Sequence, residues 1–252
     1  MYDIVIIGAG MAGLTAAIYG SRAGKKVLVL ESKMHGGQII NTINIENWPG
    51  NFRVSGAELM QNVYQQAVDL GAEVKYEEVL EVIDGAEKTV KTENGSYRAK
   101  ALIIATGTEP RKMSDKQTAD AGNRAISYCA TCDGALFKGK PVVVVGSGNT
   151  AKHEMKYLEN IASKVYHIHH DDSIPKDAVA VFVAIGRVPN TRLFEGLIDI
   201  DKQGFIEADE DCKTSAKGIF VAGDCRTKST RQLVTAASDG AIAAGAAVEY
   251  LK

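Results

Sequence analysis

The stretch DIVIIGAGMAGL, residues 3–14, decides the fold of this chain. An apolar run leads into Gly8-Ala9-Gly10-Met11-Ala12-Gly13 and then into a helical pattern, which predicts a strand, a tight turn and a helix in succession. Glu31 lies 23 residues after Gly8, at the end of the next apolar run. This spacing favours a dinucleotide site, with a pyrophosphate at the turn and a ribose on the Glu31 carboxylate. A glycine turn in an unliganded α/β domain is the alternative interpretation.

Strands and helices alternate along the rest of the chain. Strand-like apolar runs occupy residues 3–7, 27–30, 101–105, 141–145, 164–168 and 178–184. Helical periodicity covers residues 11–21, 55–70, 151–160 and 233–251. A second glycine turn, Gly146-Ser147-Gly148-Asn149-Thr150-Ala151, also follows a strand and opens a helix. The sequence therefore predicts an α/β fold with two Rossmann-like domains.

The composition and net charge of the chain indicate which classes of molecule it binds. The 252 residues include 29 basic and 31 acidic side chains, a net charge of −2, so no field of one sign attracts nucleic acid or an anionic membrane. No apolar run approaches the roughly 18 residues that span a bilayer, and the N-terminus lacks the cationic start of a signal peptide. We expect a cytoplasmic protein that binds small molecules and proteins, without nucleic acid or membrane.

Cys129-Ala130-Thr131-Cys132 is a CxxC pair, followed directly by Asp133. Two sulfurs at this spacing can bridge, and in an intracellular chain the spacing indicates redox chemistry. The Asp133 carboxyl could deliver the proton that a thiolate leaving group needs when a disulfide is reduced.

Two other interpretations of the cysteines are a zinc site and a purely structural disulfide. Zinc would need a second pair of ligands, but Cys212 and Cys225 are separated by twelve residues and no histidine pair accompanies them. We interpret Cys212 and Cys225 as ordinary half-buried thiols. Four of the five histidines are expected to be partly exposed residues rather than metal ligands: His153, His167, His169 and His170.

Further motifs follow in order along the chain. They are Gly36-Gly37-Gln38 with Thr42, IENWPG at 45–50, ATG at 105–107, CATCDG at 129–134 and AGDCRTKSTRQLVTAASDGAIAA at 222–244. On these segments the chain resembles the low-molecular-weight thioredoxin reductases over nearly its whole length. The resemblance implies FAD in a discontinuous domain, residues 1–111 and 216–252, and a second domain, residues 112–215, that carries the CxxC pair.

The resemblance also implies roles for individual residues. Cys132 would face the flavin, Cys129 would attack the disulfide of a thioredoxin-like partner, and Asp133 would be the acid. The resemblance also implies a homodimer, because members of the family form homodimers. The residues implied in FAD binding are Gly8, Gly10, Met11, Ala12, Gly13, Glu31, Gly37, Gln38, Thr42, Asn47, Val79, Ala105, Thr106, Gly107, Gly223, Asp224, Arg231, Gln232 and Leu233.

The second glycine turn departs from the family where NADPH would be held. Thioredoxin reductases carry an arginine cluster after the following strand, whereas this chain has HHDDSIP at 169–175 and no arginine between Arg124 and Arg187. Each lost charge-assisted contact is worth about 1.5–3 kcal/mol, so we expect NADPH to bind poorly. Asp171, 25 residues after Gly146, could hold the ribose of NADH instead. Only five residues then separate Asp172 from the run at Ala178, too few for the missing half of the domain.

In both departures the sequence resembles the ferredoxin-dependent flavin thioredoxin reductases. We therefore predict a flavin-dependent disulfide reductase that receives electrons from ferredoxin. The alternatives are an NADH- or NADPH-dependent enzyme with weak nucleotide affinity, and a non-catalytic flavin redox sensor. Ferredoxins are acidic, so their docking surface should be basic. Candidate docking residues are Arg22, Lys25, Lys26, Arg226, Lys228, Lys138 and Lys140.

Overall fold

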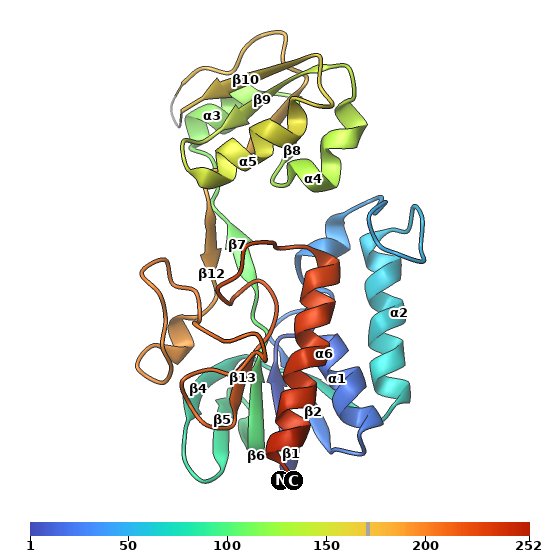
Figure 1. The fold of residues 1–252 in the computed structure, drawn as a ribbon, viewed down its shortest axis with the longest axis vertical. Coiled ribbons are helices and arrows are strands. Elements are labelled where there is room, and N and C mark those ends of the chain that lie inside the picture. Colours follow the sequence, from blue (N-terminus) through green and yellow to red (C-terminus); the bar gives the residue numbers. More distant parts are fainter. Residues whose placement is uncertain (170–171) are drawn as a thin grey trace. The chain divides into compact units, whose positions relative to one another are not determined.

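A computed structural model of the chain describes residues 1–169 and 172–252. The chain divides into two compact units: Met1–Thr108 with Pro189–Lys252, and Glu109–Val188 (Figure 1). The two segments that connect them, β7 (Thr108–Pro110) and β12 (Arg187–Pro189), pair as a two-stranded sheet. The first unit is therefore discontinuous in sequence.

A seven-stranded sheet forms the centre of the first unit. Its order is β3-β2-β1-β6-β5-β4, and β13 pairs with β6. The neighbours β3, β2, β1, β6 and β13 run parallel, whereas β4, β5 and β6 are antiparallel. The strands are β1 (Tyr2–Ile7), β2 (Val27–Glu31), β3 (Glu73–Tyr76), β4 (Val79–Ile83), β5 (Lys88–Thr92), β6 (Gly95–Ile104) and β13 (Ile219–Val221).

Both faces of this sheet are buried, which explains the continuous apolar runs. Ile4 and Ile6 point to the face covered by α1 (Met11–Arg22) and α6 (Leu233–Tyr250), which lie side by side (Figure 1). Val5 and Ile7 point to the other face. The first unit also contains α2 (Gly56–Asp69) and the 3₁₀ helices η1 (Gly37–Asn41) and η3 (Arg192–Phe194).

Residues 189–215 lie in the first unit, whereas the sequence analysis assigned them to the second domain. Phe194 and Ile206 from this segment are fully buried on the same face of the sheet as Leu102 and Ile104 of β6. The segment carries little regular secondary structure, so no periodic pattern linked it to the sheet that it covers.

The second unit is a smaller Rossmann-like domain that carries the CxxC pair. Its four strands are all parallel, in the order β10-β9-β11-β8, so β10 is an edge strand. The described residues between β10 and β11, 169 and 172–179, form neither helix nor strand. The predicted α/β fold with a shortened second domain is thus confirmed. The elements are α3 (Asp115–Ala121), β8 (Ala125–Ser127), α4 (Ala130–Asp133), η2 (Gly134–Phe137), β9 (Pro141–Val145), α5 (Asn149–Leu158), β10 (Lys164–Ile168) and β11 (Ala180–Val183).

The contact between α1 and α6 depends on a glycine. A Cβ atom at Gly240 would lie only 2.2 Å from the carbonyl oxygen of Ala12, so no larger residue fits without moving a helix. Gly245, one and a half turns further along α6, faces open space, and a Cβ there would meet no atom within 4 Å. The two glycines provide a matched comparison within one helix.

We expect Gly240→Ala to lower the free energy of unfolding by about 1–3 kcal/mol, because the added methyl group overpacks the contact. Gly245→Ala should raise it by up to about 1 kcal/mol through helix propensity alone. Urea unfolding of the two variants and the wild-type protein measures both effects. Equal stability of the two variants would contradict the close approach.

Candidate functional site

The first glycine turn, after β1, brings backbone segments into close contact. Gly8 has a φ of +105°, and a Cβ there would lie 2.4 Å from the Ala105 carbonyl oxygen. A Cβ at Gly13 would lie 1.9 Å from the Gly8 carbonyl oxygen. At Gly10, by contrast, a Cβ would meet nothing within 4 Å. Gly8 and Gly13 are therefore required for the close packing of the turn, whereas Gly10 leaves open space beside the backbone.

Glu31 is fixed against this turn. One oxygen of its carboxylate accepts a hydrogen bond from the Ala9 N–H at 2.9 Å, and the other accepts one from the Lys33 N–H at 3.1 Å. The Gly36 N–H donates to the Ala9 carbonyl oxygen at 2.8 Å. A Cβ at the next residue, Gly37, would lie 3.6 Å from the Gly10 Cα. The second glycine pair thus borders the open space beside Gly10.

The start of α6 approaches the same end of the sheet. The backbone N–H of Gly223, which follows β13, donates to Asp239 Oδ2 of α6 at 3.0 Å. A Cβ at Gly223 would lie 2.9 Å from the Ala12 Cβ, so this turn packs directly on α1. Arg231 Nε donates to the Asp224 carbonyl oxygen at 3.1 Å. The turn after β13 is therefore held between two helices.

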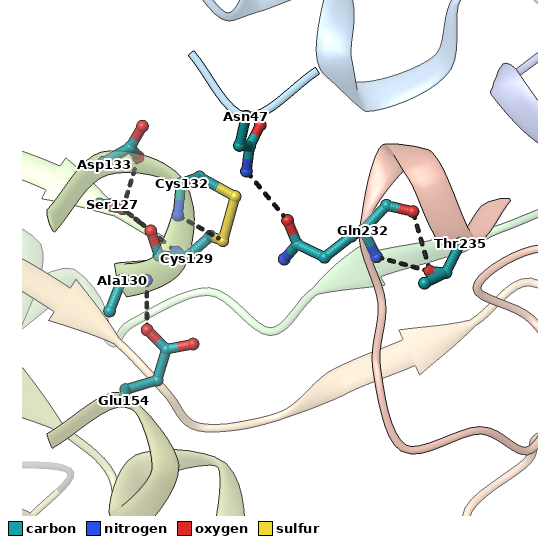
Figure 2. Close-up of a disulfide and its surroundings, with 9 residues drawn as sticks. All are labelled: Asn47, Ser127, Cys129, Ala130, Cys132, Asp133, Glu154, Gln232 and Thr235. Carbon is teal, nitrogen blue, oxygen red and sulfur yellow. Dashed lines mark hydrogen bonds between the residues drawn. A yellow bond between two sulfur atoms is a disulfide. The ribbon is translucent and has the colours of Figure 1, made fainter. Parts of the chain in front are cut away.

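Most of the residues expected to bind a cofactor follow the carboxyl ends of parallel strands in the first unit. Such ends meet at one edge of a sheet, where ligands of α/β folds bind. Asn47 Nδ2 donates to Gln232 Oε1 at 3.1 Å, which joins the loop before α2 to the residue before α6 (Figure 2). Val79 follows β3, whose last residue, Tyr76, pairs with Glu31. The remaining expected residues follow β1, β2, β6 and β13: Gly8 to Gly13, Gly37, Gln38, Thr42, Ala105 to Gly107, Gly223, Asp224, Arg231 and Leu233.

Cys129 and Cys132 form a disulfide in the second unit, with their Cα atoms 5.3 Å apart (Figure 2). The short helix α4 begins directly after Cys129, whose sulfur accepts a hydrogen bond from the Cys132 N–H at 3.2 Å. Among the described residues, no group of three or more His, Cys, Asp or Glu could hold a metal ion. The pair is therefore built as a disulfide on a tight turn.

Ser127 links Asp133 to the disulfide. Its hydroxyl donates to Asp133 Oδ2 at 2.6 Å and accepts a hydrogen bond from the Cys129 N–H at 3.1 Å (Figure 2). The Asp133 carboxyl is thus held beside the CxxC pair by a neutral group. Sequence reasoning missed Ser127, because a lone serine at the end of a three-residue strand carries no pattern.

Glu154 is a second carboxyl at the CxxC turn that sequence reasoning missed. From α5, its Oε2 accepts a hydrogen bond from the Ala130 N–H, between the two cysteines (Figure 2). Burial raises the pKa of the Glu154 carboxyl, and the nearby charge of Asp133 acts in the same direction. The hydrogen bond from Ala130 and the charges of His153 and Arg187 oppose the shift.

Cys212 and Cys225 are fully buried, which corrects the expectation of half-buried thiols. Cys212 packs in the core beside α6, and Cys225 packs on the opposite face of the sheet. Burial raises the pKa of the Cys212 thiol to about 11 and raises that of Cys225 as well. Both side chains are therefore poor nucleophiles at neutral pH.

The second glycine turn has the same construction as the first. Gly146 has a φ of +142°, and a Cβ there would lie 2.4 Å from the Ala184 carbonyl oxygen, whereas a Cβ at Gly148 would meet nothing within 4 Å. The residues that follow this turn differ from those that follow the first turn. A ring nitrogen of His167, in β10, lies 2.5 Å from the Gly146 carbonyl oxygen.

The segment after β10 folds back on itself. The His169 N–H donates to Asp172 Oδ2 at 2.8 Å, and Gln117 of α3 donates to the backbone oxygens of both residues. The candidate ribose ligand Asp171, together with His170, lies outside the described residues.

Two of the expected basic docking residues are not surface groups. Arg226 and Lys228 both bind the buried Asp239 carboxylate, at 3.1 Å and 2.7 Å, and their side chains are 12% and 10% exposed. They hold α6 to the turn after β13, so a docking surface for an acidic partner cannot include them. Arg22, Lys26, Lys138 and Lys140 are exposed, and Lys25 is half-buried.

Comparison with known proteins gives consistent matches along the whole chain. The family model for pyridine nucleotide-disulphide oxidoreductases matches residues 2–180 and 168–241. A thioredoxin reductase of Bacillus subtilis is 38% identical over 301 residues, covering 100% of this chain and 95% of that protein. The crystal structure of a thioredoxin reductase from Streptococcus pyogenes superposes with a TM-score of 0.91 at 34% identity, covering 100% of this chain and 98% of that one.

A ferredoxin-flavin thioredoxin reductase from Clostridium acetobutylicum is also similar. Its TM-score is 0.64 at 32% identity, and the match covers 99% of this chain and 97% of that one.

In the part of the chain that the structure describes, no helix is long and apolar enough to cross a membrane.

The cofactor is FAD, as in the thioredoxin reductases that this chain matches. The first turn fits such a group. Helix α1 begins at Met11, and its N-cap residue Gly10 provides no side-chain cap. The first N–H groups of the helix therefore lie beside the open space at Gly10 and can donate to a pyrophosphate. Glu31, already fixed at the turn, has the chemistry to accept hydrogen bonds from a ribose.

We expect Gly10→Ala to weaken FAD binding by about tenfold or more, a loss of at least 1.4 kcal/mol, because the methyl group fills the space beside the backbone. Stability of the apoprotein should stay near that of the wild type, since the Cβ meets no protein atom. Gly148→Ala, the equivalent change in the second turn, is the control and should leave FAD binding intact. FAD titration of the apoproteins provides the measurement, and full FAD affinity in Gly10→Ala would contradict this placement.

Proposed function

This chain belongs to the thioredoxin reductase family of pyridine nucleotide-disulphide oxidoreductases, and on that basis we propose that it reduces a thioredoxin-like protein with electrons from reduced ferredoxin. That it is a thioredoxin reductase-like flavin disulfide reductase follows from its relatives. The proposal concerns the electron donor, the partner and the residues that carry the reaction.

The shortened second unit is the observation that carries the choice of donor. The match to the Bacillus subtilis enzyme extends over 301 residues although this chain has 252, so that enzyme has residues with no counterpart here. The family model likewise matches in two pieces that meet near β10. The strand β10 lies at the edge of its sheet, and the described residues between it and β11 form neither helix nor strand. This supports the proposal that one wall of a nucleotide crevice is missing.

Charge at the end of β10 also disfavours NADPH. A 2′-phosphate needs cationic donors, but the chain has no arginine between Arg124 and Arg187. Asp172 and Asp177 lie in the segment where those donors would be, and like charges repel a phosphate. An electron donor that brings its own redox centre avoids this requirement.

A pyridine nucleotide remains the second candidate donor, and one observation favours it. The turn at Gly146 keeps the tight geometry and the open space beside Gly148 that a pyrophosphate would use. A site of this kind would lack the proposed missing wall on its adenosine side, so its affinity should be low.

The proposed reaction uses the residues of both units. When bound, FAD would supply the electron pair that reduces the disulfide. The amides of Met11 and Ala12 would bind its pyrophosphate, and Glu31 would bind a ribose. Further residues proposed to contact FAD are Gly37, Gln38, Thr42, Asn47, Val79, Ala105, Thr106, Gly107, Gly223, Asp224, Arg231, Gln232 and Leu233.

Reduction of the Cys129–Cys132 disulfide takes two electrons and two protons and yields two thiols. Cys132 is proposed to face the flavin and Cys129 to attack the partner's disulfide. The attack breaks that disulfide and forms a mixed one, and the leaving thiolate takes up a proton, for which Asp133 is the proposed donor. Cys132 then attacks Cys129, which releases the reduced partner and restores the disulfide. We propose that the enzyme works as a homodimer.

The donor test is anaerobic mixing of the oxidised protein with reduced ferredoxin, NADPH or NADH. We expect ferredoxin to bleach the visible flavin band rapidly and NADPH to do so at least about 100-fold more slowly, because two or more charge-assisted contacts are absent. Stopped-flow absorbance measures the rates. Rapid bleaching by NADPH would refute the donor assignment, and reduction of thioredoxin that stops after one equivalent would indicate a redox sensor.

The roles of the two thiols can be tested by trapping. We expect Cys132→Ser to accumulate a mixed disulfide between Cys129 and the partner, because the second thiol that would resolve it is missing. Cys129→Ser should form none, while its flavin is still reduced by the donor. Cys212→Ser is the control and should turn over normally, since Cys212 is fully buried. Non-reducing gels detect the mixed disulfide. A mixed disulfide formed through Cys132 would show that Cys132, and not Cys129, attacks the partner.

A further inference from the structure

We propose that Glu154 is a positioning residue of the dithiol: it occupies the Ala130 amide and, through its negative charge, keeps the reduced Cys129 in its thiol form until attack. The inference deepens the proposed function, on which it rests for the role of Cys129.

Three backbone amides next to the Cys129 side chain donate to oxygen atoms. The Cys129 N–H is bound to Ser127 Oγ, and the Asp133 N–H is bound to the Cys129 carbonyl oxygen at 3.1 Å. The next amide, that of Ala130, is bound to Glu154 Oε2. In the disulfide form the Cys132 N–H donates to the Cys129 sulfur. Glu154 thus removes a donor that could otherwise turn toward a sulfur anion.

The charge of Glu154 acts in the same direction. Its carboxyl accepts a hydrogen bond from the Ala130 N–H, which directly follows Cys129 in the chain. The side chains of Glu154 and Cys129 are therefore close to each other. An ionised carboxylate at such a distance disfavours a second negative charge.

The other charged groups near Glu154 come from two elements. His153 precedes it on α5, and Arg187 lies on β12, and both favour its ionised form. The packed strand β9 contributes only apolar side chains, and in β10 Lys164 is engaged with Tyr166 and His167 with the Gly146 carbonyl oxygen. Lys152 and Lys156, also on α5, are exposed. Glu154 is therefore a half-buried carboxyl that contacts the turn between the cysteines directly.

Proton balance links the two groups. When the disulfide is reduced, the S–S bond breaks and each sulfur gains one electron and one proton. When Cys129 later attacks the partner, its proton must leave, and an ionised Glu154 opposes that loss whereas a protonated one does not. Burial raises the pKa of the Glu154 carboxyl, so the carboxyl takes up a proton at a higher pH than an exposed glutamate does. Protonation of Glu154 therefore makes ionisation of the Cys129 thiol easier.

The test is labelling of the chemically reduced holoprotein with iodoacetamide across pH, read at the Cys129 peptide by mass spectrometry. In Glu154→Gln, which keeps an acceptor for the Ala130 N–H but removes the charge, we expect the pH midpoint of labelling to fall by about one unit. Glu159→Gln removes the same charge from the end of the same helix and should match the wild type. Cys212 and Cys225 provide an internal check and should stay unlabelled.

A midpoint in Glu154→Gln equal to that of the wild type would overturn the inference. A shift in Glu154→Ala but not in Glu154→Gln would also overturn it, because geometry rather than charge would then control the thiol. The measurement needs neither ferredoxin nor thioredoxin. A wrong electron donor or partner would therefore leave its outcome unchanged, and the two failures can be told apart.

Discussion

Close backbone contact at glycines is the constraint on which the first unit depends. Gly13 brings α1 against the turn after β1, and Gly240 brings α6 against α1, in each case with a carbonyl oxygen where a side chain would begin. These contacts place the start of both helices at the carboxyl edge of the sheet. The uncapped amides of α1 and the turn after β13 are positioned there as a consequence, and they provide the polar surface that a dinucleotide requires.

The second unit keeps the core of a Rossmann domain while losing its outer part. Four parallel strands bury Val142 to Val145 completely, and this is enough to hold α4 and α5 in place around the disulfide. Its edge differs, because β10 is the last strand on that side and the sequence has no arginine between Arg124 and Arg187. The small core packs through the inner strands and does not depend on further structure beyond the β10 edge.

The dithiol site combines three polar groups from different elements. Ser127 at the end of β8 holds Asp133, and Glu154 from α5 holds the Ala130 amide. Both carboxyls are thereby held at the turn between the cysteines, where an ionised carboxylate disfavours a negative charge on the sulfur that is proposed to attack. Such an arrangement favours thiols over thiolates and makes proton transfer part of disulfide exchange.

The amino-acid sequence alone determined the α/β class, the two glycine turns, the disulfide pair and the truncation after β10, because each depends on residues close together in the chain. Tertiary structure alone decided that residues 189–215 cover the first sheet, that Arg226 and Lys228 are engaged with Asp239, and that Cys212 and Cys225 are fully buried. It also decided the contact of Glu154 with Ala130, which are 24 residues apart. Local patterns report the period and chemistry of a segment, whereas burial and pairing depend on which distant segment packs against it.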